Sequence, residues 1–108
     1  MKIVFIGCVE FSYKALDSLR KVPEADVVGV VTRKKSKFNS DFRDLRPLAE
    51  SANCTCFYAS GNNQTAIEQW IKELHPDVIY CFGWSYLLRS SLLQAAPLGV
   101  VGYHPAAL

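Results

Sequence analysis

Short runs of apolar residues alternate with amphipathic segments along this chain, and that alternation limits the folds open to it. Buried strands are expected where Val, Ile and Phe cluster, at Lys2–Cys8, Asp26–Thr32, Cys54–Tyr58, Asp77–Phe82 and Val100–Tyr103. Helices are expected between them, at Ser12–Lys21, from Asp41 or Phe42 to Ala52, at Gln64–Leu74 and at Ser85–Ala95. Such alternation favours parallel pairing and right-handed crossovers. The sequence therefore predicts a three-layer α/β fold with an open, mostly parallel sheet of about five strands.

Individual residues indicate where some of these helices begin and end. Ser12 is a candidate N-cap for the first helix, because its hydroxyl can accept a hydrogen bond from a free backbone N–H. Pro47 interrupts the second helix, which is therefore either kinked or begins later, near Leu45. His75 and Pro76 end the third helix, where His75 complements the helix dipole and is expected to be structural.

Composition is that of an ordinary globular domain. The chain has 108 residues, of which 50% are apolar and 20% are charged, so we expect a single domain over residues 1–108 and no disorder. No apolar run reaches the roughly 18 residues that a membrane span needs. The first apolar run is not followed by a small-residue cleavage site, so it is expected to be a strand rather than a signal peptide. A cytoplasmic location is the corresponding expectation.

The cysteines do not have the spacing of a metal site. Cys8, Cys54, Cys56 and Cys81 form no C-x-x-C pair, and His75 and His104 are the only histidines. A zinc site would need more ligands at matching spacing. We therefore expect no metal site. The four cysteines are expected to be buried, reduced thiols of a cytosolic protein.

Ligands in open α/β sheets bind at the carboxyl ends of the strands, which directs attention to the loops that follow them. The first such loop, Gly7–Ser12, has only one glycine, and Glu10 would repel a phosphate. A dinucleotide fingerprint needs further glycines for close approach to the pyrophosphate, and no P-loop is present. A nicotinamide-dependent enzyme is therefore disfavoured.

A basic loop is expected after the second strand. It reads Arg33-Lys-Lys-Ser-Lys-Phe-Asn-Ser40 and carries four positive charges. Residues 1–53 hold ten basic and seven acidic residues, whereas residues 54–108 hold two and three, so the positive excess belongs to the first half. The loop could attract a phosphate, a nucleotide or RNA, and Arg33 could contact a 2′-phosphate of NADP. The alternative is a solvated loop without a ligand.

Two further loops contain candidate site residues. Gly83–Leu88 places two aromatic residues directly after a buried strand, which suits either a flat apolar ligand or closure of the core end. His104 follows the last strand, where an imidazole could exchange protons near neutral pH, although a lone histidine is usually structural.

Three stretches together resemble the folate-dependent formyltransferase family. They are MKIVFIGCVEFSYKAL at the start, HPDVIYCFGWSYLL in the second half, and LGVVGYHPAAL at the end, which resembles the family motif N-x-H-P-x-x-L. The order and spacing resemble the N-terminal half of the methionyl-tRNA members, and the variant GYHPAAL is most similar to an amino-sugar subgroup. The resemblance implies a Rossmann-like, formyltransferase-like fold.

The resemblance also implies a reaction, a formyl donor and site residues. Family members transfer a formyl group from 10-formyltetrahydrofolate to an amine, here a nucleotide-linked amino sugar or methionyl-tRNA. His104 would polarise the formyl oxygen or shuttle protons. The loop expected to hold and wall the pterin ring contains Trp84, Tyr86, Leu87 and Leu88. The loop expected to face the acceptor contains Cys8, Glu10, Phe11 and Ser12.

Two departures from the family pattern affect these expectations. The family asparagine falls on Gly102, which has no side-chain amide, and losing one oxyanion donor costs about a hundred- to a thousandfold in rate. The family aspartate lies beyond the position of Leu108, so the chain is expected to be the N-terminal part of a catalytic domain, truncated after the histidine motif and inactive alone. The alternatives are a non-catalytic α/β binding module and, less favoured, an NADP- or nucleotide-binding domain. An exposed edge strand or an uncovered apolar face at the truncated end is expected to allow a homodimer.

Overall fold

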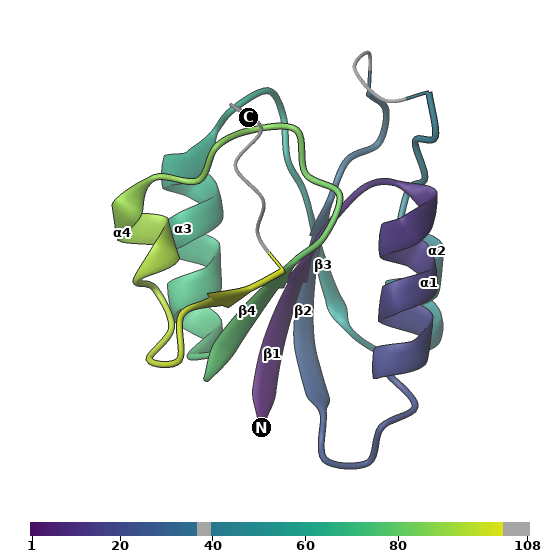
Figure 1. Ribbon diagram of the computed structural model, residues 1–108, viewed down its shortest axis with the longest axis horizontal. Coiled ribbons are helices and arrows are strands. Elements are labelled where there is room, and N and C mark those ends of the chain that lie inside the picture. The colour runs from purple at the N-terminus through teal and green to yellow at the C-terminus, as the bar shows by residue number, and fades with distance from the viewer. Residues whose placement is uncertain (37–39, 103–108) are drawn as a thin grey trace.

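The computed structural model of the chain describes residues 1–36 and 40–102. Within them, one parallel sheet has the order β3-β2-β1-β4-β5, formed by β1 (Lys2–Ile6), β2 (Asp26–Thr32), β3 (Thr55–Tyr58), β4 (Val78–Cys81) and β5 (Val100–Val101). One face is covered by α1 (Glu10–Leu19) and α2 (Arg46–Ser51), and the other by α3 (Gln64–Leu74) and α4 (Ser90–Leu93) (Figure 1). The predicted three-layer fold is confirmed.

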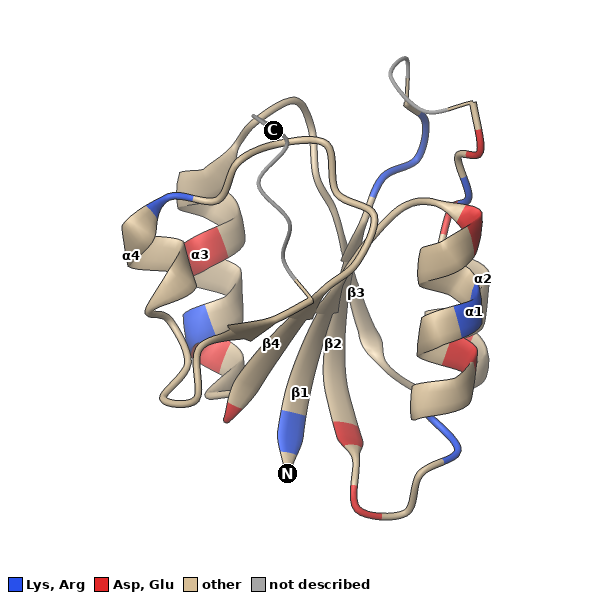
Figure 2. Cartoon of the chain, in the orientation of Figure 1, with Lys and Arg blue, Asp and Glu red and all other residues tan. Residues whose placement is uncertain are grey.

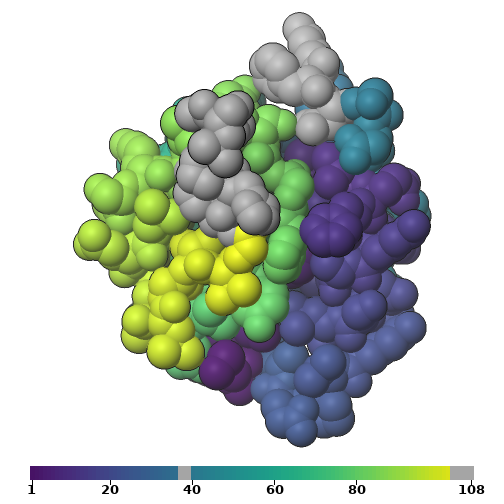
Figure 3. Space-filling view, viewed as in Figure 1, coloured from purple at the N-terminus to yellow at the C-terminus, as the bar shows by residue number. Residues whose placement is uncertain are grey.

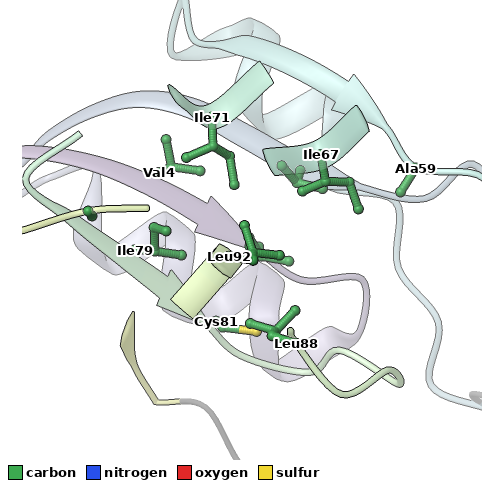
Figure 4. Packing of buried hydrophobic residues seen from close by; sticks show 11 residues of the cluster. Val4, Ala59, Ile67, Ile71, Ile79, Cys81, Leu88 and Leu92 are labelled. Atoms are coloured by element: carbon green, nitrogen blue, oxygen red, sulfur yellow. The ribbon is translucent and has the colours of Figure 1, made fainter. Parts of the chain in front are cut away.

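Each face of the sheet carries its own apolar core because successive strand residues point to opposite faces. In β1, Val4 and Ile6 belong to the cluster under α3 and α4, whereas Phe5 belongs to the cluster under α1 and α2. Figure 4 shows Ile71 of α3 beside Val4, with Ile67 further along the helix toward Ala59, all in one apolar cluster. Burial on both sides explains why β1 reads as a nearly continuous apolar run.

Part of the sheet lies open beside α1. A pocket of about 310 Å³ there is lined by Phe5, Ala15, Ser18, Leu19, Val22, Tyr80 and Phe82. A second pocket, of about 210 Å³, shares Leu19, Val22 and Tyr80 and extends to Met1. Figure 3 looks onto this face, where green atoms of the β4 region are visible between purple-blue α1 and yellow β5. No helix of the described residues covers this stretch of β4.

The second helix begins at Arg46, so the predicted start at Asp41 or Phe42 is wrong and the alternative start near Leu45 is confirmed. Pro47 lies in the first turn, where its missing N–H costs nothing. The residues before the helix have another role. Arg43 N donates to the Cys8 carbonyl (2.8 Å), and Glu10 N donates to the Asp41 carbonyl (3.0 Å), so this segment pairs with the loop after β1.

The predicted helix Ser85–Ala95 is wrong for its first five residues. The helix begins only at Ser90, after Arg89 in an extended conformation (φ −67°, ψ 154°), and ends at Leu93. Strand ends also differ slightly from the prediction: β1 ends at Ile6 rather than Cys8, and β4 spans Val78–Cys81. Tyr103, the predicted end of the last strand, lies outside the described residues.

Two predicted helix-end residues have different outcomes. Ser12 is not the N-cap of α1; Val9 is, and Ser12 is the third helical residue, whose Oγ accepts a hydrogen bond from Val9 N (3.2 Å). His75 does end α3, in a left-handed conformation with φ 50°.

Among the described residues no helix has the length and apolarity to span a membrane.

Candidate functional site

The loops after β1 and β4 lie side by side at the carboxyl edge of the sheet. The chain places β2 and β3 on one side of β1 and then β4 and β5 on the other. Open α/β sheets bind their ligands beside the strand ends at such a reversal. Two backbone hydrogen bonds join the loops, from Cys8 N to the Gly83 carbonyl (3.2 Å) and from Phe82 N to the Ile6 carbonyl (2.9 Å).

Two glycines and a serine allow this close approach. The Ser12 hydroxyl is fully buried and donates to the Phe82 carbonyl (2.5 Å) while it accepts from Val9 N. A Cβ on Gly7 would overlap the Phe82 carbonyl oxygen and lie 2.6 Å from Ser12 Cβ. Gly83 has φ +71°, and a Cβ there would overlap Val9 and Ser12. Helix α1 therefore begins directly against the β4 loop.

The four residues predicted to face an acceptor lie in different environments. Cys8 and Ser12 are fully buried, and burial raises the pKa of the Cys8 thiol to about 11, so the thiol is protonated at neutral pH. Glu10 pairs with the guanidinium of Arg43 (2.9 Å). Phe11 is 61% exposed and packs edge-on against Phe82. Of the four, Glu10 and Phe11 have solvent-accessible side chains.

Arg33 does not behave as a residue of a solvated basic loop. It is only 7% exposed, and its guanidinium stacks over the rings of Trp84 (4.4 Å) and Tyr86 (4.8 Å). Its Nη2 donates to the Gly61 carbonyl (2.7 Å). Arg33 thus ties the end of β2 to the loops after β3 and β4. A run of basic residues gives no sign of such burial, so sequence reasoning missed this role.

Gln64 is a second residue that sequence reasoning missed. It is 3% exposed, and its amide hydrogen-bonds to the backbone on either side of Leu88. Leu88 itself is buried in the core beneath α4, near Cys81 and Leu92 (Figure 4). In the sequence, Gln64 looks like any polar residue at the start of an amphipathic helix. Its contact with the backbone around Leu88 could therefore not be predicted.

Two lysines of the basic loop, Lys34 and Lys35, border a pocket. It has a volume of about 280 Å³ and is lined by Arg33, Lys34, Lys35, Tyr58, Ala59, Ser60 and Gly61. Lys34 and Lys35 are exposed, and Figure 2 shows the basic stretch in blue just beyond β2. Tyr58 donates to Asp44 (2.5 Å), and this bond raises the tyrosine pKa to about 12. Of the three basic residues that line this pocket, Lys34 and Lys35 are exposed to solvent and Arg33 is buried.

The comparisons with known proteins agree with the fold and with the sequence motifs. The family model described as formyl transferase matches residues 1–108. The chain belongs to the formyl transferase family.

Relatives and solved structures of the formyl transferase family extend this result. Methionyl-tRNA formyltransferase of Ehrlichia ruminantium (strain Welgevonden) is 30% identical over 112 residues, which are 100% of this chain and 37% of the relative. That of Mycoplasma pneumoniae is 25% identical, with 100% and 35% covered. The chain thus spans little more than a third of the length of these relatives.

Two solved structures share the fold. Glycinamide ribonucleotide transformylase 1 from Symbiobacterium toebii has a TM-score of 0.70 at 14% identity, with 93% of this chain and 49% of that chain covered. Phosphoribosylglycinamide formyltransferase from Anaplasma phagocytophilum also has a TM-score of 0.70, at 15% identity, with 93% and 47% covered. At these identities the likeness concerns the fold alone.

In this member of the formyl transferase family, Gly102 stands where the motif resemblance places the family asparagine. Its backbone conformation and its surroundings both restrict which residue can occupy the position. Gly102 has φ +79°, and a Cβ there would overlap the Phe82 ring. A side chain at position 102 would therefore require both backbone strain and movement of Phe82. His104, the predicted proton-transfer residue, lies outside the described residues. Within residues 1–36 and 40–102, no group of His, Cys, Asp or Glu has the arrangement of a metal site.

Proposed function

We propose that this chain binds 10-formyltetrahydrofolate and forms the N-terminal part of a catalytic domain that transfers its formyl group to an amine. The observation that carries this proposal is the loop Trp84–Leu88, which is held in an irregular conformation at the reversal point of a formyltransferase-family sheet. That is the position where open α/β sheets bind their ligands.

The residues of this loop suit the pterin ring of the folate. Trp84 and Tyr86 are half-buried aromatic side chains that can wall a flat ring, and Leu88 fixes the loop to the core. The backbone between β4 and α4 lies outside helix and strand, so its polar groups follow no regular ladder. The bound folate would supply the formyl carbon.

The chemistry needs an uncharged amine, stabilisation of an oxyanion and movement of a proton. We assign proton transfer to His104, because an imidazole exchanges protons near neutral pH. Gly102 cannot supply a side-chain amide to the oxyanion. Stabilisation at that point must then come from His104, from backbone N–H groups or from a residue outside this chain.

An acceptor that carries phosphate fits the positive charges of the lysines near the ends of β2 and β3. Lys34 and Lys35 border the pocket of about 280 Å³ at the ends of β2 and β3, and Phe11 is exposed beside the loop after β1. Both proposed acceptors, a nucleotide-linked amino sugar and methionyl-tRNA, combine an amine with phosphate groups. Exposed lysines at the strand ends would attract either one.

Calorimetric titration with 5-formyltetrahydrofolate, a stable folate, tests the donor site directly. The chain should bind it, and Trp84→Ala should weaken binding by about tenfold or more, since an aromatic wall would be lost. Leu98→Ala is the matched control, because Leu98 is 61% exposed and lies beyond α4, away from the loop. A folded chain that gives no binding heat would contradict the proposal.

A formyl-transfer assay tests the proposed reaction. It uses a polypeptide that contains the whole proposed catalytic domain, residues 1–108 included. His104→Ala should abolish transfer from 10-formyltetrahydrofolate to an amino-sugar nucleotide or methionyl-tRNA. Full activity of that variant would remove His104 from the mechanism. Folate binding without transfer to any amine would favour the second candidate, a non-catalytic binding module, for which the Gly102 geometry is the supporting observation.

A further inference from the structure

The segment that connects β4 to α4 is irregular in its backbone yet held from two sides. Residues 82–89 contain no helix or strand. A loop that is free to move must lose conformational entropy when a ligand orders it, and that loss weakens binding. A loop ordered in advance by the protein avoids this cost. Contacts that fix the loop without belonging to the ligand pocket therefore affect affinity.

Gln64 holds the loop from the start of α3. Its Nε2 donates to the carbonyl of Leu87 and to Asn62 Oδ1 (2.8 Å), and its Oε1 accepts from the backbone N–H of Arg89 (2.7 Å). The buried Gln64 side chain thus supplies both a hydrogen-bond donor and a hydrogen-bond acceptor to the loop backbone, as a neighbouring strand does in a sheet. A carboxylate of the same size has no donor, so only the amide can make all three bonds.

Arg33 holds the aromatic side chains of the same loop from the end of β2. Its guanidinium lies 4.4 Å from the Trp84 ring centroid and 4.8 Å from that of Tyr86. Its bond to the Gly61 carbonyl fixes the guanidinium in turn. Stacking of a cation on aromatic faces is strengthened where water is excluded, and Arg33 is only 7% exposed.

The far end of the loop is anchored as well. Arg89 Nη2 donates to Thr65 Oγ1 (2.8 Å), and the Ser91 hydroxyl donates to Glu68 (2.6 Å), both on α3. The Leu88 side chain is buried in the core. Leu87, which lies between these anchors, is 49% exposed, so the loop presents this stretch to solvent while its ends stay fixed.

We propose that Gln64 and Arg33 are positioning residues, which order the loop Trp84–Leu88 before a ring-shaped ligand binds and so raise affinity without contacting that ligand. The inference rests on the proposed folate site. It adds that part of the specificity for a flat ring comes from two residues outside the pocket-forming loop, one on α3 and one after β2.

The test compares Gln64→Glu with Gln69→Glu in the 108-residue chain. Both replace an amide by a carboxylate on α3, but Gln69 is exposed. Gln64→Glu should speed backbone hydrogen exchange of residues 84–89 at least tenfold and weaken binding of 5-formyltetrahydrofolate by about tenfold, whereas Gln69→Glu should change neither. Both readouts are taken where urea titration shows each variant to be fully folded.

Arg33→Lys provides a second variant if Gln64→Glu fails to fold. It keeps the charge but loses the planar stacking group, so exchange at Trp84 and Tyr86 should increase and affinity should fall. Unchanged loop exchange in folded variants would overturn the inference, as would faster exchange with unchanged folate affinity. If the wild-type chain binds no folate, the proposed function fails instead, and loop exchange still shows whether the two residues order the loop.

Discussion

Single polar side chains, rather than whole elements, join the loops of the candidate site. Ser12 connects the start of α1 to the end of β4 through a hydroxyl that both donates and accepts. From the sequence, Ser12 was predicted to cap the helix in the usual way. That prediction is wrong, because Val9 is the N-cap, and the Phe82 partner of Ser12, 70 positions away in sequence, became visible only in the structure.

Removal of the Ser12 hydroxyl should destabilise the fold measurably. Ser12→Ala leaves Val9 N and the Phe82 carbonyl without their partner, and an unsatisfied buried polar group costs about 1–3 kcal/mol. Urea unfolding measures this difference. Ser18→Ala on the exposed side of the same helix should change stability by less than about 0.5 kcal/mol. Equal effects of the two substitutions would contradict the role assigned to Ser12.

At the scale of elements, local signals predicted α3 well and α4 poorly. Gln64–Leu74 has regular apolar spacing and is preceded by an asparagine, and the structure has a helix with those bounds. The segment after β4 also has helix-forming residues, yet residues 85–89 are extended or irregular. Gln64 and Arg33 engage that segment from distant positions, and such contacts outweigh weak helix propensity.

The start of α3 offers a test at this scale. Asn63 Oδ1 accepts from Ala66 N (3.4 Å), so Asn63→Ala should lower the free energy of unfolding by about 0.5–1 kcal/mol, the lower part of the range for a lost cap. Asn63→Asp keeps the acceptor and should keep the stability. The measurement is urea unfolding, and a loss of stability in the Asp variant as large as in the Ala variant would count against capping.

At the scale of the whole molecule, buried or half-buried thiols lie on both sides of the sheet. Burial raises the pKa of Cys8 and Cys56 to about 11 and that of Cys81 to about 12. Among the four cysteines the structure has no disulfide. The unfolded chain ionises its thiols near pH 8.5, whereas the folded chain keeps them protonated to higher pH. Alkaline conditions therefore favour the unfolded state.

Stability should accordingly be constant up to about pH 8.5 and then fall as the pH rises toward 11–12, because the unfolded state releases protons first. Urea midpoints measured from pH 7 to pH 10.5 test this. Cys81→Ala removes one raised pKa, so its midpoint should start lower but fall less steeply. A wild-type midpoint that stays level to pH 10.5 would contradict the burial of these thiols.

The face beside α1 bears on the predicted homodimer. The two adjoining apolar pockets leave part of the apolar sheet face uncovered there. Pairing of two copies stays a prediction.

The sequence by itself determined the layers and the order in which they are made, because period-2 and period-3.6 apolar patterns depend only on local geometry. It also directed attention to the loops at the strand ends and to the formyltransferase motifs. Only the tertiary structure decided that Arg33 stacks on Trp84, that Gln64 bonds to the backbone around Leu88, and that Ser12 reaches Phe82. These contacts join residues far apart in sequence, and a buried polar group is satisfied by whichever partner the fold brings within hydrogen-bond distance.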